Sequence, residues 1–143
     1  MQPVLEEYFD TLKGKKLAVI GMGISNLPLI EKLLDAGMNV CACDKREREA
    51  FNGQAEALEQ RGLKLYLGSS YLDHLEDADV IFRTPGMRPD LPQLARAVGH
   101  GAELTSEMEA FLSLCPCRII AVTGSDGKTT TTTIIAGMLK AAG

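Results

Sequence analysis

Two glycine turns, each between a short apolar run and a helical stretch, constrain the fold of this chain more than any other feature. The first turn lies near the amino terminus, at residues 21–26, and the second near the carboxyl terminus, at residues 123–127. Apolar strands that alternate with helices are typical of open parallel sheets covered on both faces. The sequence therefore predicts an α/β protein that carries two nucleotide-type loops.

The first turn opens a βαβ unit. Residues 16–20 are predicted to form a strand, residues 27–36 a helix that stops at Gly37, and residues 39–43 a second strand that ends at Asp44. Dinucleotide-binding folds hold a ribose with an acidic residue at that place, but Asn26 here replaces the third glycine of their fingerprint. We therefore expect a nucleotide-type ligand at this turn, with NAD the less favoured choice. Lys45 and Arg46 follow Asp44 and add positive charge suited to a diphosphate.

The second turn has the layout of a phosphate-binding loop. Residues 117–122 are a β-branched apolar run, which predicts a buried parallel strand. Two glycines follow and permit positive φ, so that backbone N–H groups can converge on phosphate oxygens. Lys128 is placed to reach the β- and γ-phosphates of ATP, and the Thr129 hydroxyl to hold Mg²⁺. Residues 130–142 are predicted to form a helix whose N-terminal dipole faces the anion.

One position departs from the common phosphate-loop pattern, because Val122 stands where its first glycine would be. The junction Gly-Lys-Thr-Thr between a strand and a helix still favours phosphate binding over a purely structural turn. The expected ATP-binding residues are Gly124, Ser125, Asp126, Gly127, Lys128, Thr129 and Thr130.

The middle of the chain continues the alternation of strands and helices. A Pro/Gly loop at residues 83–89 follows a predicted strand, at the place where open α/β sheets put their ligands. Ser106 is predicted to cap a helix that runs to about Leu114, with Glu109 at the capping-box position. The other predicted strands are 64–67, 79–82 and 103–105, the other predicted helices are 51–61 and 90–98, and Met108, Phe111 and Leu112 are expected in the core.

Composition narrows the class of protein. Apolar residues make up 45% of the chain, which is ample for a core, and the net charge of −4 gives no basic footprint for nucleic acid. No segment approaches the roughly 18 apolar residues of a membrane span, and residues 1–16 lack the layout of a signal peptide. We expect a cytoplasmic protein with reduced thiols. The spacing of its two Cys-x-Cys pairs matches no zinc signature, so the four cysteines are interpreted as small buried hydrophobes.

The two turns, in this order, resemble those of the Mur ligases of bacterial peptidoglycan synthesis, and most closely the D-glutamate-adding branch. The stretches that carry the resemblance are residues 15–26, 84–87, 105–109 and 123–133. The family shares the missing phosphate-loop glycine, whereas Asp126 stands where many relatives carry Asn. The resemblance implies a Rossmann-like UDP-sugar domain over residues 1–115 and the start of a truncated ATP-binding domain over residues 116–143. The rest of that domain and an amino-acid domain are expected beyond Gly143.

The resemblance also implies a reaction. In that family ATP phosphorylates the carboxylate of UDP-N-acetylmuramoyl-L-alanine, and the amine of D-glutamate attacks the acyl phosphate to give an amide. Lys128 would then be catalytic, because it would stabilise the negative charge on the transferred phosphoryl group, and Thr129 would be a Mg²⁺ ligand. The UDP-sugar residues that the resemblance implies are Gly23, Ile24, Ser25, Asn26, Asp44, Lys45, Arg46 and Gly86.

The acidic Mg²⁺ ligand, the histidine and the modified lysine of the family's central domain are expected beyond residue 143, as is the site for D-glutamate. We therefore expect the chain alone not to catalyse ligation. The apolar residues of 118–143 would then be partly exposed and favour self-association. Two alternatives remain open. A NAD-binding Rossmann regulator or dehydrogenase fragment would leave the Gly-Lys-Thr sequence at 127–129 unexplained. A P-loop kinase or ATPase would leave residues 1–115 without a role.

Overall fold

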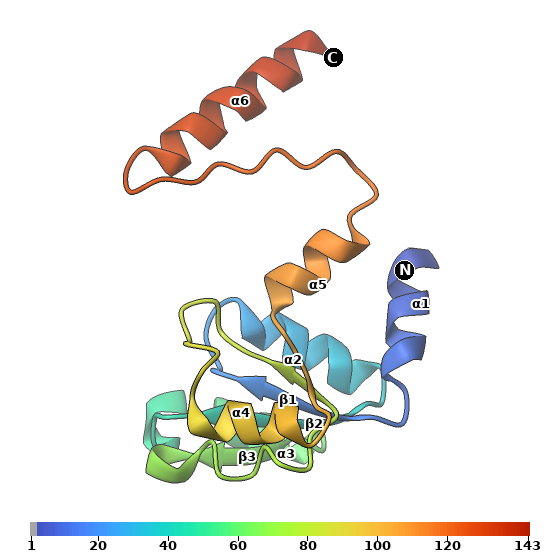
Figure 1. The fold of residues 1–143 in the computed structure, drawn as a ribbon, viewed down its shortest axis with the longest axis vertical. Coiled ribbons are helices and arrows are strands. Elements are labelled where there is room, and N and C mark those ends of the chain that lie inside the picture. Colours follow the sequence, from blue (N-terminus) through green and yellow to red (C-terminus); the bar gives the residue numbers. More distant parts are fainter. Residues whose placement is uncertain (1–2) are drawn as a thin grey trace.

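A five-stranded parallel sheet lies at the centre of the structure, a computed structural model that describes residues 3–143 (Figure 1). Six α-helices accompany it, and the last of them lies apart from the sheet at the carboxyl end of the chain. The strands are β1 (Lys16–Ile20), β2 (Asn39–Asp44), β3 (Lys64–Leu67), β4 (Val80–Phe82) and β5 (Glu103–Thr105). The helices are α1 (Pro3–Leu12), α2 (Asn26–Asp35), α3 (Gln54–Gln60), α4 (Pro92–Gly99), α5 (Glu107–Leu114) and α6 (Lys128–Ala142), with 3₁₀ turns at Arg48–Phe51 and Gly68–Ser70.

The strand order is β3-β2-β1-β4-β5. The chain winds outward from β1 through β2 to β3, and then returns to place β4 on the other side of β1. In the register of the sheet Val19 lies opposite both Ala42 and Phe82. The order therefore reverses between β1 and β4, and such a switch point opens a crevice at the carboxyl ends of the strands. The predicted α/β fold with an open parallel sheet is confirmed.

Strand residues alternate between the two faces of the sheet, and each face has its own core. On one face Leu17 and Val19 of β1 pack in a cluster that also contains Ile30 of α2 and Leu58 of α3. The other face carries Ala18, Ile20, Cys43 and Ile81, and the cluster there includes Leu94 and Ala97 of α4. The two faces explain why these short strands are almost wholly apolar, since a parallel sheet is covered on both sides.

Two helices differ from the predicted spans for local reasons. The helix expected at residues 51–61 is divided, because Asn52 and Gly53 adopt positive φ values of 48° and 84° between the 3₁₀ turn and α3. The helix expected from residue 90 begins at Pro92, because the residue before a proline is driven to the extended conformation, here Leu91. The predicted cap of α5 is confirmed, since the Glu109 amide donates to Ser106 Oγ at 3.1 Å.

The strand predicted at residues 117–122 is wrong. These residues pair with no strand in the part of the chain that the structure describes, and Ile119 and Ile120 are 46% and 53% exposed. A strand requires hydrogen bonds from a neighbouring strand, so apolar composition cannot form one by itself. The prediction that all four cysteines are buried is confirmed for Cys43 alone, since Cys41 and Cys115 are half-buried and Cys117 is exposed.

Apolar side chains are also exposed on the last two helices. Met108, Phe111 and Leu112 of α5 were expected in the core, but their exposed fractions are 42–57%, and Ala110 alone of α5 is buried. That expectation is wrong because α5 meets the sheet domain along one narrow face. Helix α6 buries none of its residues, so the predicted exposure of its apolar side chains is confirmed. Self-association through them stays a prediction. Among residues 3–143, no helix has both the length and the apolar character needed to cross a bilayer.

Candidate functional site

A pocket of about 430 Å³ lies at the carboxyl ends of β1, β2 and β4, at the switch point of the sheet. This is the place where open α/β sheets bind their ligands. Five of the predicted UDP-sugar residues line it, namely Gly23, Asp44, Lys45, Arg46 and Gly86. The other residues that line it are Ile20, Gly21, Tyr71, Thr84, Met87, Arg88 and Leu91.

The turn after β1 forms one wall of this pocket and requires a glycine at its first position. Gly21 has a φ of +88°, and its amide donates to the carbonyl oxygen of Cys43 at 2.7 Å. A Cβ atom at Gly21 would lie 2.6 Å from Cγ2 of Thr84, on the loop after β4. The turn and the loop after β4 therefore approach each other so closely that no side chain fits between them.

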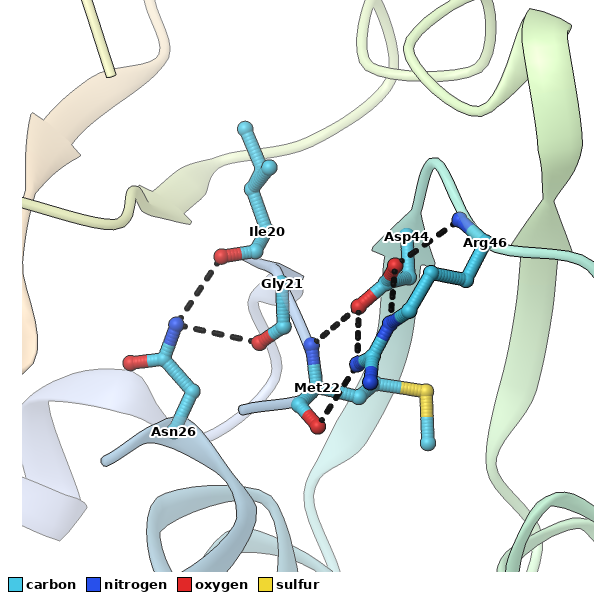
Figure 2. Close-up of polar contacts among 6 residues, drawn as sticks. All are labelled: Ile20, Gly21, Met22, Asn26, Asp44 and Arg46. Carbon is cyan, nitrogen blue, oxygen red and sulfur yellow. Dashed lines mark hydrogen bonds and ion pairs between the residues drawn. The ribbon is translucent and has the colours of Figure 1, made fainter. Parts of the chain in front are cut away.

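Asp44, at the end of β2, joins the turn to the next strand (Figure 2). Its carboxylate accepts four hydrogen bonds: from the Met22 amide at 2.7 Å, from the Arg46 amide at 2.9 Å, and from Arg46 Nε and Nη2 at 3.0 and 2.8 Å. The residue is only 5% exposed. Four bonds fill the acceptor capacity of a carboxylate, so Asp44 has none left for the hydroxyls of a ribose. This arrangement does not favour the NAD alternative.

The protonation of Asp44 is set by the same contacts. Burial raises the pKa of the carboxyl, but the hydrogen bonds from the Arg46 side chain and from the Arg46 and Met22 amides outweigh it. The pKa therefore lies below its ordinary value of 3.8. The carboxylate is ionised throughout the neutral range and forms an ion pair with the charged Arg46 guanidinium beside it.

This lowered pKa predicts a pH dependence of stability. A carboxyl whose pKa falls on folding contributes stability that is present above the unfolded pKa and is lost as the pH falls through the folded one. We expect the difference in unfolding free energy between the wild type and Asp44→Asn to be constant above about pH 5 and to shrink below about pH 4. Urea titrations at a series of pH values would measure it. A difference that stayed the same at pH 3 and pH 7 would contradict the assignment.

Arg46 is held at the mouth of the pocket by three different contacts. Besides its pair with Asp44, Nη2 donates to the Met22 carbonyl at 3.1 Å, and the guanidinium lies 4.5 Å from the centre of the Phe51 ring. No hydrogen bond joins Nη1 to any residue of the described chain, and the side chain is 44% exposed. The guanidinium is therefore fixed in place with donor capacity left for a ligand.

Asn26, the residue that replaces the third glycine, braces the turn. Its Nδ2 donates to the carbonyls of Ile20 and Gly21 at 2.9 and 3.1 Å, and the residue is 2% exposed (Figure 2). Its Oδ1 has no hydrogen-bond partner among residues 3–143. Ile24 is 96% exposed, and both Ile24 and Ser25 lie outside the lining of the pocket. The structure thus brings five of the eight predicted residues together and leaves Ile24, Ser25 and Asn26 outside.

The second glycine turn adopts positive φ at both of its glycines, as the sequence predicts. Gly124 and Gly127 have φ values of 151° and 74°, and α6 begins directly after Gly127. Lys128 Nζ donates to the carbonyls of Gly124 and Ser125, so the ammonium lies over the turn. Thr129 follows in the first turn of the helix, and the whole segment is exposed. The donor set fits a polyphosphate, with a lysine, a helix N-terminus and free loop amides close together.

Two residues that line the pocket could not be predicted from a pattern in the sequence. Tyr71 lies in the long connection between β3 and β4, and Leu91 directly precedes α4. Both reach the pocket only because the chain returns to place β4 beside β1. A second cavity of about 300 Å³ lies at the opposite edge, where Lys16, Asn39 and Lys64 begin their strands. None of the predicted site residues lines it. In the described chain, no group of three or more His, Cys, Asp and Glu residues could hold a metal ion.

Comparison with known proteins gives consistent matches. Residues 15–106 match the family model described as Mur ligase MurD-like, N-terminal domain. The chain is 53% identical over 135 residues to the UDP-N-acetylmuramoylalanine–D-glutamate ligase of Ruminiclostridium cellulolyticum, covering 94% of this chain and 29% of that one. It is 48% identical over 143 residues to the enzyme of the same name from Clostridium novyi, covering 100% and 31%. The chain thus spans about a third of the length of these relatives.

Solved structures of related ligases are similar to this chain in both fold and sequence. The UDP-N-acetylmuramate-alanine ligase MurC of Thermotoga maritima superposes with a TM-score of 0.57 at 28% identity, over 88% of this chain and 29% of that one. A murein peptide ligase from Psychrobacter arcticus superposes with a TM-score of 0.58 at 25% identity, over 90% and 27%. These two proteins therefore share both sequence and fold with this chain.

Proposed function

This chain belongs to the Mur ligase family, with a MurD-like N-terminal domain over residues 15–106, and we therefore propose that it binds UDP-N-acetylmuramoyl-L-alanine in the pocket at the switch point. We further propose that residues 124–130 supply the phosphate loop for ATP in the ligation of that substrate to D-glutamate. The observation that carries the proposal is the convergence of the glycine turn, the Asp44–Arg46 pair and the Gly86 loop on one pocket.

In the proposed complex the diphosphate lies against the turn at residues 21–23 and the N-terminus of α2, where backbone N–H groups and the helix dipole favour an anion. Lys45 and the Nη1 group of Arg46 add positive charge, while Asp44 keeps Arg46 in place. Tyr71 and Leu91 offer apolar surface on which a pyrimidine ring can lie. The exposed Gly86 leaves room beside the loop for the bulky sugar.

The phosphate loop has a different task in this proposal. The carboxylate of the UDP-sugar attacks the γ-phosphorus of ATP and ADP leaves; the amine of D-glutamate then attacks the acyl carbon and phosphate leaves. Lys128 and the loop amides would stabilise the charge that spreads over the transferred phosphoryl group. The Thr129 hydroxyl would be a ligand of Mg²⁺, which neutralises the polyphosphate when bound.

We also propose the division of the chain into a UDP-sugar domain at residues 1–115 and the beginning of an ATP-binding domain at 116–143. In support, α5 ends at Leu114, and residues 115–127 contain neither helix nor strand. We assign the protein to the cytoplasm, in keeping with its four free cysteines and its nucleotide substrates.

Calorimetric titration with UDP-N-acetylmuramoyl-L-alanine tests the proposal, with NAD and Mg·ATP as comparators. We expect the UDP-sugar to bind, NAD to give no heat, and Arg46→Ala to weaken UDP-sugar binding about tenfold or more, because a charge-assisted hydrogen bond is lost. The matched control is Arg48→Ala. Its guanidinium pairs with Glu56 and Glu59, away from the pocket, so its loss should leave the affinity unchanged. Tight NAD binding without a response to the UDP-sugar would overturn the proposal.

A further inference from the structure

We propose that Arg83 is a positioning residue for the UDP-sugar, one that shapes the loop at residues 84–87 and ties this loop to α5. The inference rests on the proposed function, because it concerns the same pocket. Arg83 is not among the residues that line the pocket, whereas Thr84, Gly86 and Met87 are. Its effect on a ligand must therefore pass through the loop that follows it.

Arg83 donates hydrogen bonds to the loop on both sides of Gly86. Its guanidinium Nη1 donates to the carbonyl of Pro85 at 3.4 Å and to the carbonyl of Met87 at 3.3 Å, the residues on either side of Gly86. Its backbone amide donates to the Thr105 carbonyl at 2.8 Å, which places the start of the side chain against β5. The side chain is 19% exposed; its bond to Met87 is partly buried, whereas its bond to Pro85 is exposed to water.

Met87 packs against the core on the α4 face of the sheet, but few hydrogen bonds hold the rest of the loop. One backbone bond, from the Met87 amide to the Thr84 carbonyl at 3.0 Å, closes the turn. Within residues 3–143, Arg83 makes the only side-chain hydrogen bonds to the carbonyls of this loop. Pro85 and Gly86 are exposed, so packing does not fix them. The position of Gly86 in the pocket therefore depends on the guanidinium behind it.

The same guanidinium also contacts the helix that leads to the phosphate loop. Arg83 Nη2 lies 3.7 Å from Oε1 of Glu109, in the first turn of α5. The Glu109 amide is held in turn by the Ser106 cap. One side chain, that of Arg83, therefore contacts both the loop at residues 84–87 and the start of α5. An arginine suits this task, because its fork offers separate donors to the loop carbonyls and to the carboxylate, which a lysine cannot do at once.

The test measures UDP-N-acetylmuramoyl-L-alanine binding to the 143-residue chain by calorimetry for wild type, Arg83→Met, Arg83→Lys and the control Arg96→Met. We expect Arg83→Met to weaken binding about fivefold, on the scale of one or two lost hydrogen bonds. Arg83→Lys should recover part of the loss. Arg96 pairs with Glu76 at 3.4 Å on an exposed surface away from the pocket, so Arg96→Met should keep wild-type affinity.

Amide exchange separates positioning from a general loss of stability. We expect the Met87 amide to exchange faster in Arg83→Met, while amides of β1 and β2 keep their wild-type rates. Wild-type affinity in Arg83→Met, in a chain that does bind the UDP-sugar, overturns this inference alone. A wild-type chain that does not bind the UDP-sugar overturns the proposed function and this inference together. If Arg83→Met does not fold, Arg83→Lys decides, and an affinity equal to that of the wild type overturns the inference.

Discussion

Replacing Asp44 with alanine is expected to lower the free energy of unfolding by about 2–3 kcal/mol and to weaken UDP-sugar binding about tenfold or more. The carboxylate accepts four hydrogen bonds in a nearly buried position, and its loss leaves the Met22 amide without an acceptor. This loss of unfolding free energy is smaller than that expected for a fully buried ion pair, because the Arg46 side chain is 44% exposed and water can solvate it. Urea unfolding followed by circular dichroism would measure stability, and calorimetry would measure binding.

Asp90→Ala is the matched control for this prediction. Asp90 also makes a bidentate pair with an arginine two residues away, Arg88, but both side chains are more than 60% exposed. Surface pairs of this kind contribute little, so the stability of Asp90→Ala should equal that of the wild type. Equal losses in Asp44→Ala and Asp90→Ala would show that burial of Asp44 has no energetic role.

Gly21→Ala is expected to lower the free energy of unfolding by about 3 kcal/mol, the sum of two separate effects. A non-glycine residue at a φ of +88° is strained by about 1–2 kcal/mol. The new Cβ would also lie 2.6 Å from Cγ2 of Thr84, and relieving such an overlap costs about 1–3 kcal/mol. Because Thr84 begins the Gly86 loop, UDP-sugar affinity should fall as well. Unfolding and binding are measured as for Asp44→Ala.

A double variant separates the two effects. Adding Thr84→Ser to Gly21→Ala removes the methyl group in the overlap but leaves the backbone strain, so about 1 kcal/mol should return. Gly99→Ala serves as the control, because Gly99 has no positive φ and no atom within 4 Å of its Cβ position. If the double variant were no more stable than Gly21→Ala, contact with Thr84 would not be the cause.

The elements of the sheet were predictable because they are encoded locally. Each of the five strands lies within a residue of its predicted span, since a strand buried on both faces has an apolar run that turn residues interrupt. The start of α5 was predictable from Ser106, whose cap the structure shows. By contrast, residues 117–122 have the same apolar character but no partner strand in the described chain. Pairing is a property of two segments, which one segment cannot reveal.

The site was predictable in part for the same reason. Gly23, Asp44 and Gly86 lie at or after the carboxyl ends of strands that meet at one edge of the sheet, so these positions placed them in the pocket. The role of Asp44 was less accessible. Its position suggested that the carboxylate accepts hydrogen bonds from a ligand. Instead, the side chain of Arg46, two residues later, folds back and donates two hydrogen bonds to that carboxylate. Tyr71 entered the pocket through topology, which local patterns do not contain.

Helix α6 carries five consecutive threonines, residues 129–133, directly after Lys128, and this has a consequence for the proposed phosphate loop. Threonine is a poor helix former, and five of them cost about 3 kcal/mol of helix propensity relative to alanine. The helix buries no residue to offset this, with Ile134 and Leu139 both more than half exposed. A phosphate at its first turn and a partner on its apolar face would both stabilise the same ordered helix. Two such binding events would therefore be coupled through the ordering of this helix, and each would raise the affinity of the other without any contact between them.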